Sequence, residues 1–226
     1  MENVPAYVGI IFGLTTLLTI YFFALATTQM RLVLSILFIW LAAQAVISIT
    51  GFYYRNTHAQ PPAFLLATLP NMLVILVLFI TKWGRTFIDG MNLKLLTILH
   101  IIRIPVEIVL LWLCMHKVVP QIMTFEGWNF DILSGISAPF IYYIAFRKET
   151  YNKWVLLVWN IICLILLINI VRIAILSAPF AFQRFGLDQP NIAVLYFPYI
   201  WLPACVVPVV LLSHLASIRL LLKKNK

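Results

Sequence analysis

The sequence predicts an all-α protein, a polytopic membrane helix bundle of about seven transmembrane helices with its N-terminus outside and its C-terminus in the cytoplasm. Hydrophobic residues make up 63% of the 226-residue chain and charged residues only 10%. A soluble domain has about a quarter charged residues to cover its surface, so lipid has to be the solvent for much of this chain. Apolar runs of roughly 20 residues recur along the sequence, and basic residues gather between alternate runs.

Each apolar run is expected to cross the roughly 30 Å of hydrocarbon as a helix, because lipid offers backbone groups no hydrogen-bonding partner. The runs lack the alternation of polar and apolar residues that a membrane barrel shows. Spans and short connections use up the whole chain, which leaves a single integral membrane domain over residues 1–226. The expected spans are about 5–27, 32–53, 62–81, 95–115, 131–146, 154–177 and 191–218.

The first three runs are uninterrupted apolar stretches. No basic residue precedes run 5–27, so a cleaved signal peptide is not expected there. Run 32–53 follows Arg31 and ends in aromatic residues, and run 62–81 ends just before Lys82. Aromatic and basic residues at these ends are typical of membrane boundaries.

The later runs carry features that predict bends. Pro105 inside run 95–115 removes a backbone donor and is expected to kink that helix. Run 131–146 is short for a span, and run 154–177 begins with an interfacial tryptophan. The last run contains three prolines, which we expect to bow its helix without ending it: Pro198, Pro203 and Pro208.

Basic residues divide unevenly between the two predicted sides of the membrane, eleven against three. The positive-inside rule places the richer side in the cytoplasm, with the protein in the cell membrane. If run 131–146 did not cross, three basic residues after it would change sides and most of the bias would vanish. The net charge of +9 therefore reflects topology and contact with membrane lipids, and nucleic acid is not expected as a partner. The richer side holds Arg31, Lys82, Arg85, Lys94, Arg147, Lys148, Lys153, Arg219, Lys223, Lys224 and Lys226; the other holds Arg55, Lys117 and Arg184.

Ionisable residues within the spans mark the expected functional region, because they are costly in lipid and usually face the bundle interior. His100, Arg103 and Glu107 are spaced by three and four residues, so they lie on one face of their helix. Counting about 1.5 Å per residue from the nearest cytoplasmic basic residue gives two tiers, with Arg103 between them. The inner tier is His100, Asn160 and His214, and the outer tier is Glu107, Asp131, Asn169 and Arg172.

The outer tier is predicted to form one polar cavity for a small-molecule or lipid ligand. An unpaired buried charge costs several kcal/mol, so we expect Arg172 to bridge Glu107 and Asp131. Arg103 is the second candidate partner for Glu107. The connection 116–130 is too apolar for an aqueous loop, and we expect it to dip into the membrane or lie along it, lining or capping the cavity. The candidate ligand-binding residues are Glu107, Asp131, Asn169, Arg172, Arg103 and Glu126.

No cofactor and no metal ion is predicted. His100 and His214 share a depth on different helices, an arrangement that could ligate haem or a metal. Neither a further ligand pair nor a small-residue groove accompanies them, so they are only weak metal candidates. The three cysteines, Cys114, Cys163 and Cys205, lack metal-ligand spacing and are interpreted as buried small hydrophobes.

Two short segments resemble the exosortase and archaeosortase transpeptidases. Ser134-Gly135 opens one predicted span, and the segment 169–173, Asn-Ile-Val-Arg-Ile, ends the next. Those enzymes place a nucleophilic cysteine just before the Ser-Gly pair, where this chain has Leu133. No histidine follows in the outer half of the last span, and transpeptidase activity is not adopted as a prediction.

Three function classes remain open, and whether the protein is an enzyme is left undecided. The first is a small-molecule or lipid binding or transport protein that uses the outer tier. The second is a membrane-embedded enzyme acting on a lipid or isoprenoid, with His100 or Glu107 as acid or base. In that class Arg103 or Arg172 would bind an anionic headgroup. The third is a structural or accessory membrane subunit, in which a buried ion pair only fixes helix packing.

Overall fold

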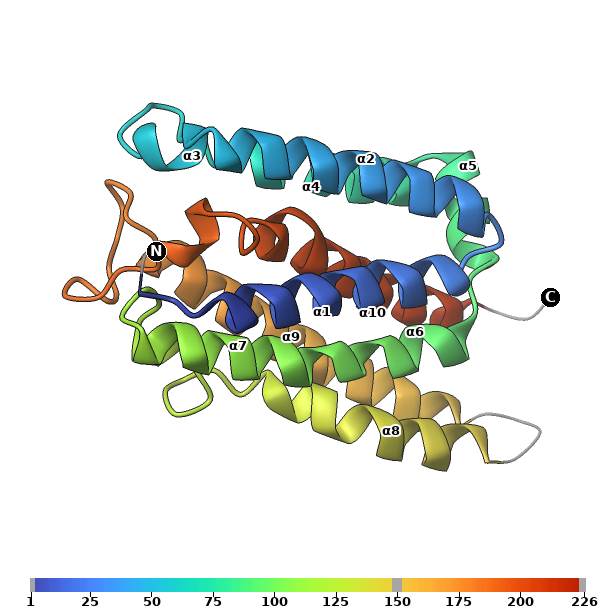
Figure 1. Ribbon diagram of the computed structural model, residues 1–226. Coiled ribbons are helices and arrows are strands. Elements are labelled where there is room, and N and C mark those ends of the chain that lie inside the picture. Colours follow the sequence, from blue (N-terminus) through green and yellow to red (C-terminus); the bar gives the residue numbers. More distant parts are fainter. Residues whose placement is uncertain (1–2, 148–151, 224–226) are drawn as a thin grey trace.

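The computed structural model describes residues 3–147 and 152–223, and within these ranges the regular elements are helical and none is a strand. The long helices run roughly along one direction, and the start of α1 and the end of α10 lie at opposite ends of the bundle (Figure 1). The helices are α1 (Ala6–Leu25), α2 (Met30–Ile49), α3 (Phe52–Arg55), α4 (Leu65–Ile80), α5 (Lys82–Asp89), α6 (Leu93–Leu99), α7 (Arg103–Met115), α8 (Ile132–Phe146), α9 (Lys153–Ser177) and α10 (Val207–Leu222). Shorter turns are η1 (His100–Ile102), η2 (Gln121–Met123), η3 (Ala193–Leu195) and the π-helical η4 (Leu202–Val206).

Five helices of the described chain are long and apolar enough to cross a membrane: α1, α2, α9 and the continuous stretches Leu93–Met115 and Leu202–Leu222. Helices α4 and α5 pass the same test only as a pair bent by 89°, and α8 is a shorter apolar helix. The all-α prediction is therefore confirmed. The predicted count of seven depends on α4 and α8.

Large apolar side chains cover the outside of these helices. Ile39 on α2 is 71% exposed and Phe140 on α8 is 65% exposed, whereas Arg103 and Glu107 are each only 2% exposed. Single exposed apolar residues are normal on soluble proteins, but extensive apolar patches are not. The outer surface therefore suits hydrocarbon, and the polar side chains collect inside.

The last predicted run is shorter as a helix than expected. Its helix begins at Leu202, and the start predicted at residue 191 is wrong. Residues 191–201 form an irregular segment that contains the turn η3. Ala193 and Leu195 of this segment are buried, so its apolar composition reflects packing against protein.

Both stretches in which the prolines predicted a bend depart from regular α geometry. The 3₁₀ turn η1 interrupts the α6–α7 stretch just before Pro105. The π-helical η4 contains Pro203 and precedes Pro208. Because Pro208 lacks an N–H, the carbonyl of Ala204 has no helical donor and is free for other partners.

The corner between α4 and α5 is made by a glycine. A Cβ on Gly84 would lie 2.4 Å from the backbone of α4, so only glycine fits there. The Thr81 hydroxyl caps α5 by accepting a hydrogen bond from the Gly84 N–H at 3.0 Å. At the far end of α5, Asp89 pairs with Arg219 and Lys223 of the C-terminal region, each at 2.9 Å. These contacts hold α5 across the end of the bundle.

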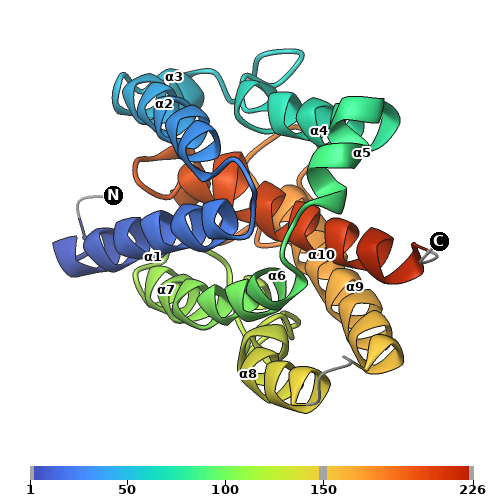
Figure 2. The ribbon, with the colours of Figure 1, turned by 90° about the vertical axis from the view of Figure 1, so that its right-hand side faces the viewer.

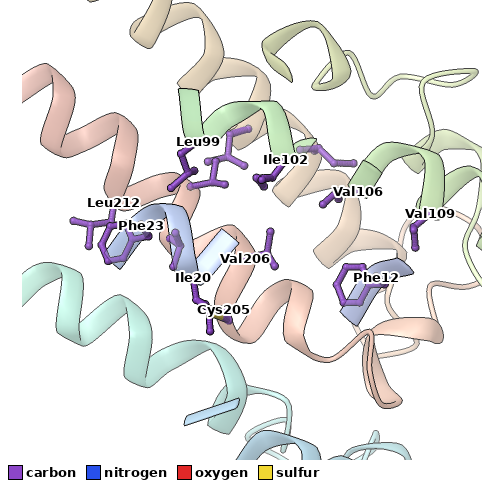
Figure 3. Packing of buried hydrophobic residues seen from close by; sticks show 14 of the residues in the cluster. Phe12, Ile20, Phe23, Leu99, Ile102, Val106, Val109, Cys205, Val206 and Leu212 are labelled. Carbon is purple, nitrogen blue, oxygen red and sulfur yellow. The ribbon is translucent and has the colours of Figure 1, made fainter. Parts of the chain in front are cut away.

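The apolar core surrounds the last helix. Viewed along the bundle, α10 lies centrally and is flanked by α1, α4, α6 and α9 (Figure 2). Figure 3 shows side chains from α1 and the α6–α7 stretch meeting those of η4 and α10. The packed residues include Phe12, Ile20, Phe23, Leu99, Ile102, Val106, Val109, Cys205, Val206 and Leu212.

Candidate functional site

The α6–α7 stretch presents three ionisable residues to the bundle interior. His100, Arg103 and Glu107 are buried at 0%, 2% and 2% exposure, as their spacing of three and four residues predicted. Helix α8 packs against this stretch along α6, η1 and α7. A Cβ on Gly135 of α8 would lie only 3.0 Å from the backbone N of Ile104, so the glycine permits the close approach.

Arg103 forms a buried ion pair with the residue that precedes α8. Its Nη1 atom lies 3.0 Å from Oδ1 of Asp131, and both side chains are nearly inaccessible, at 3% and 7% exposure. The thiol of Cys163 on α9 and the Ser134 hydroxyl lie beside this pair. Asp131 and Arg103 thus neutralise each other where the two helices meet.

Glu107 is held by an amide from the outer connection. The Asn129 amide donates to Oε2 of Glu107 at 2.6 Å and to the carbonyl of Met123 at 2.9 Å. Its Oδ1 accepts the backbone N–H of Asp131 at 3.0 Å. Asn129 therefore ties the two carboxylate residues together, and the 116–130 connection packs into the bundle with Val119 fully buried.

Two histidines meet on the inner side of Arg103. The rings of His100 and His214 stack with centroids 3.9 Å apart and planes 12° apart. Nδ1 of His214 lies 2.8 Å from Oδ1 of Asn160, and the Asn160 amide donates to the Leu156 carbonyl at 2.8 Å. The amide oxygen is therefore an acceptor, so Nδ1 of His214 is the donor and its Nε2 carries a lone pair when the ring is neutral. The inner tier predicted from depth does come together.

We call the seven residues of this arrangement the polar column: His100, Arg103, Glu107, Asn129, Asp131, Asn160 and His214. Several of its atoms have no hydrogen-bond partner among the described residues, including both ring nitrogens of His100, Nε2 of His214 and Nε of Arg103. The nearby hydroxyl of Ser217 also has no hydrogen-bond partner among the described residues. Most buried polar atoms in proteins are hydrogen-bonded to protein or to ordered water, so water or a bound ligand would complete these contacts.

The structure does not bring the predicted arginine to the carboxylates. Arg172 is exposed on α9 and forms no ion pair in the part of the chain that the structure describes, so the predicted bridge to Glu107 and Asp131 is wrong. Counting residues along a helix gives the position of a side chain along the bundle axis, but not the side of the helix on which it lies. The buried face of α9 contains Asn160 and Cys163, and Arg172 is turned away from Asn160 by roughly 120° at 100° per residue. Arg103 pairs with Asp131 instead, and no ion pair joins it to Glu107 among the described residues, so that predicted partnership is also wrong.

Two further candidates also lie away from the column. The Asn169 amide donates to the carbonyl of Trp128 at 2.9 Å, which ties α9 to the outer connection. Glu126 is exposed in that connection. Sequence reasoning missed Asn129, although its place two residues before Asp131 in an apolar segment was a signal of local capping.

The geometry of the histidines does not suit shared metal ligation. Imidazole lone pairs lie in the ring plane, and two nearly parallel stacked rings cannot direct them to one point. Among the described residues no group of three His, Cys, Asp or Glu side chains is placed to hold a metal ion. The free thiols of Cys114, Cys163 and Cys205 lie in separate places along the bundle.

A family model described as "Domain of unknown function (DUF8737)" matches residues 60–222. The chain belongs to this family. The DUF8737 region runs from the segment before α4 to the end of α10 and contains every residue of the polar column. No curated protein and no solved structure matches the chain.

The polar column of this DUF8737 protein combines groups that exchange protons. It holds two carboxylates, two imidazoles and one guanidinium, and Arg103 is the only fixed cation among them. From His100 to Glu107 the column extends for seven residues of the α6–α7 stretch, roughly 10 Å along the helix. Intramembrane chains of this kind serve proton relays and substrate sites in transporters.

Proposed function

We propose that this DUF8737 protein is a cell-membrane transport protein that binds a small molecule together with a proton at the polar column. It crosses the membrane seven times, with its N-terminus outside and its C-terminus in the cytoplasm. The observation that carries the proposal is the presence of two groups of buried polar residues on one face of the α6–α7 stretch. A hydrogen bond and a ring stack join Asn160, His214 and His100, and an ion pair and hydrogen bonds join Arg103, Asp131, Asn129 and Glu107.

The proposed topology requires α4 and α8 to cross. With 16 and 15 residues they measure roughly 24 and 22 Å, somewhat less than the hydrocarbon thickness. A local thinning of the bilayer accommodates such short helices at modest cost. Lys82 and Arg147 follow the two helices directly and support placing those ends in the cytoplasm. Of the basic residues that favour this orientation, Lys148, Lys224 and Lys226 lie outside the described residues.

The charge balance of the column favours a bound proton. Arg103 compensates one carboxylate through its 3.0 Å contact with Asp131. In the part of the chain that the structure describes, the hydrogen-bond donor to Glu107 is the neutral Asn129 amide. An ionised Glu107 would leave one uncompensated negative charge in the bundle, so a single proton on the carboxylate pair makes the site neutral. Proton loss then creates a charge that a cationic substrate group would compensate.

The column also offers donors and acceptors for a polar solute. Among the described residues, the Nε atom of Arg103 is a buried donor without a partner, and Nε2 of His214 is a buried acceptor without one. Burying such atoms costs on the order of 1–3 kcal/mol each. A structural role alone would be served better by apolar side chains of similar volume, which supports a binding role.

The test is solute-coupled proton movement. The purified protein is placed in liposomes that enclose a pH-sensitive dye, the membrane potential is clamped, and amino acids, amines, sugars and carboxylic acids are added outside in turn. We expect one solute class to change the internal pH, and the variant Glu107→Gln to lose most of that signal. Glu126→Gln is the matched control, because Glu126 is exposed and outside the column.

A folded Glu107→Gln variant that transports as well as the wild type would contradict the proposal. If no solute produces a signal while column variants lose only their folding, the protein is a structural subunit instead.

A further inference from the structure

A second site lies on the other side of the bundle, between α2 and α4. These helices flank a cleft of about 420 Å³ whose floor is formed by η4 and α10, through Cys205, Pro208, Val209 and Leu212. In the view along the bundle, α2 and α4 stand apart on the same side of α10 (Figure 2). The cleft shares no residue with the polar column.

The cleft is held open by one backbone carbonyl. Pro208 cannot donate to the Ala204 carbonyl, which instead accepts the indole N–H of Trp40 at 2.7 Å and the amide of Asn71 at 2.9 Å. Trp40 belongs to α2 and Asn71 to α4, so both helices are fixed to η4 at this level. Below it, the cleft walls are the apolar faces of the two helices.

The walls have the chemistry and length for one hydrocarbon chain. Ile36 and Leu37 of α2 face Val74 and Leu78 of α4 across the apolar interior. From Asn71 to Leu78 the cleft follows α4 for seven residues, or roughly 10 Å. That length lies within the roughly 15 Å hydrocarbon depth of a single membrane leaflet.

The cytoplasmic end of the cleft is cationic. Gln29 and Trp83 line it there. Arg31 follows Gln29 by two residues, and Lys82 and Arg85 flank Trp83; all three cations are exposed. None of them has a carboxylate partner in the described part of the chain. Basic residues at the cytoplasmic end of a gap between membrane helices are typical of sites for anionic lipid headgroups.

We propose that this cleft binds one anionic phospholipid of the cytoplasmic leaflet. One acyl chain lies between α2 and α4 on the floor formed by α10, and the phosphate contacts Arg31, Lys82 and Arg85. Charge complementarity selects the anionic headgroup, since a zwitterionic lipid offers the same chain without the net charge. The binding is independent of the proposed transport function.

Native mass spectrometry of the purified full-length protein tests this site, with phosphatidylglycerol and phosphatidylcholine of identical chains as probes. We expect the wild type to retain one phosphatidylglycerol in preference to phosphatidylcholine. The triple variant Arg31→Gln, Lys82→Gln, Arg85→Gln should lower that preference by about tenfold or more. The matched control is Arg55→Gln, Lys117→Gln, Arg184→Gln, which removes the same charge from residues predicted to lie outside and should keep the preference.

A second variant tests the chain-binding part. Val74→Trp places a bulky ring in the cleft wall and should reduce retention of both lipids, while thermal unfolding checks that the protein is folded. An unchanged preference in the first triple variant would overturn the proposal. So would an equal loss in the control triple variant, or undiminished retention by a folded Val74→Trp variant. Column variants such as Glu107→Gln should retain lipid as the wild type does, which separates failure here from failure of the transport proposal.

Discussion

The two sides of the bundle bury polar groups in different ways. On the α2–α4 side the buried groups are neutral and paired: the Tyr53 hydroxyl donates to Gln44 at 2.6 Å, and Trp40 and Asn71 share the Ala204 carbonyl. On the α6–α10 side the polar column contains ionisable groups, and several of their atoms have no partner among the described residues. The apolar outer surface thus encloses neutral, paired polar groups on one side of the bundle and ionisable, incompletely paired groups on the other.

This difference separates packing from function. A neutral, fully paired group fixes the position of a helix and adds a modest amount to stability. A buried charge with incomplete pairing lowers stability, and in a membrane such groups are usually kept where they bind or move something. The incomplete pairing in the column therefore supports the proposed transport function, and the paired neutral groups fix the positions of α2 and α4.

The largest expected effect comes from breaking the buried ion pair. Arg103→Gln leaves Asp131 buried without a counter-charge, and we expect a loss of about 3–5 kcal/mol in the free energy of unfolding. Thermal and denaturant unfolding in detergent measures it. Arg172→Gln is the matched control, since this exposed arginine should change stability by no more than about 0.5 kcal/mol. Equal small losses in both variants would show that the Arg103 pair is not buried.

A change on the neutral side should cost stability without affecting transport. Gln44→Leu leaves the buried Tyr53 hydroxyl without its acceptor, for an expected loss of about 1–3 kcal/mol. Adding Tyr53→Phe should recover much of that loss, because both partners are then apolar. Unfolding measurements and the liposome assay are made on the same preparations. Loss of the proton signal in a folded Gln44→Leu variant would place α2 in the transport site. It would contradict the distinction between the neutral α2–α4 side and the polar column.

The smallest expected effect lies at Asp89, at the end of α5. The hydrogen bond from Arg219 lowers the pKa of Asp89 below its ordinary value of 3.8; partial burial opposes this, and Lys223 adds to it. The pair therefore stabilises the fold fully above about pH 4 and loses its effect as pH falls through the lowered pKa. Asp89→Asn should cost about 1 kcal/mol or less at pH 7, because the group is partly exposed.

The measurement for Asp89 is the difference in melting temperature between the wild type and Asp89→Asn as a function of pH. It should shrink toward zero in acid. Asp188→Asn, at an exposed residue without an ion pair in the described chain, is the control and should show no such difference. A difference for Asp89→Asn that persists below the lowered pKa would rule out the ion pair as its cause.

The sequence predicted the positions of the buried groups along the bundle better than the side of the helix on which each group lies. Apolar run lengths located α8 to within a residue, and depth counting brought His100 and His214 together correctly. The same counting failed for Arg172, because helical phase decides which side a residue faces. The position of a residue along the bundle axis follows from the number of residues in its helix. Pairing between helices depends on how those helices are rotated and packed.

Non-local contacts account for the other differences. Asn129 binds Glu107 across 22 positions of sequence, and no local pattern specifies that pair. The right-angle corner after α4 depends on the absence of a side chain at Gly84, which composition alone does not reveal. The irregular segment before Leu202 is apolar because it packs on the bundle, so hydropathy extended the last span too far.

The central claim is that the carboxylate pair of the column holds one proton. Infrared difference spectroscopy of the membrane-embedded protein at neutral pH reads this directly through the carbonyl stretch of a protonated carboxyl group. We predict such a band in the wild type, its loss in Glu107→Gln and its persistence in Glu126→Gln. A wild-type spectrum with no protonated-carboxyl band from Glu107 or Asp131 would mean that both carboxylates are ionised, and would contradict the account.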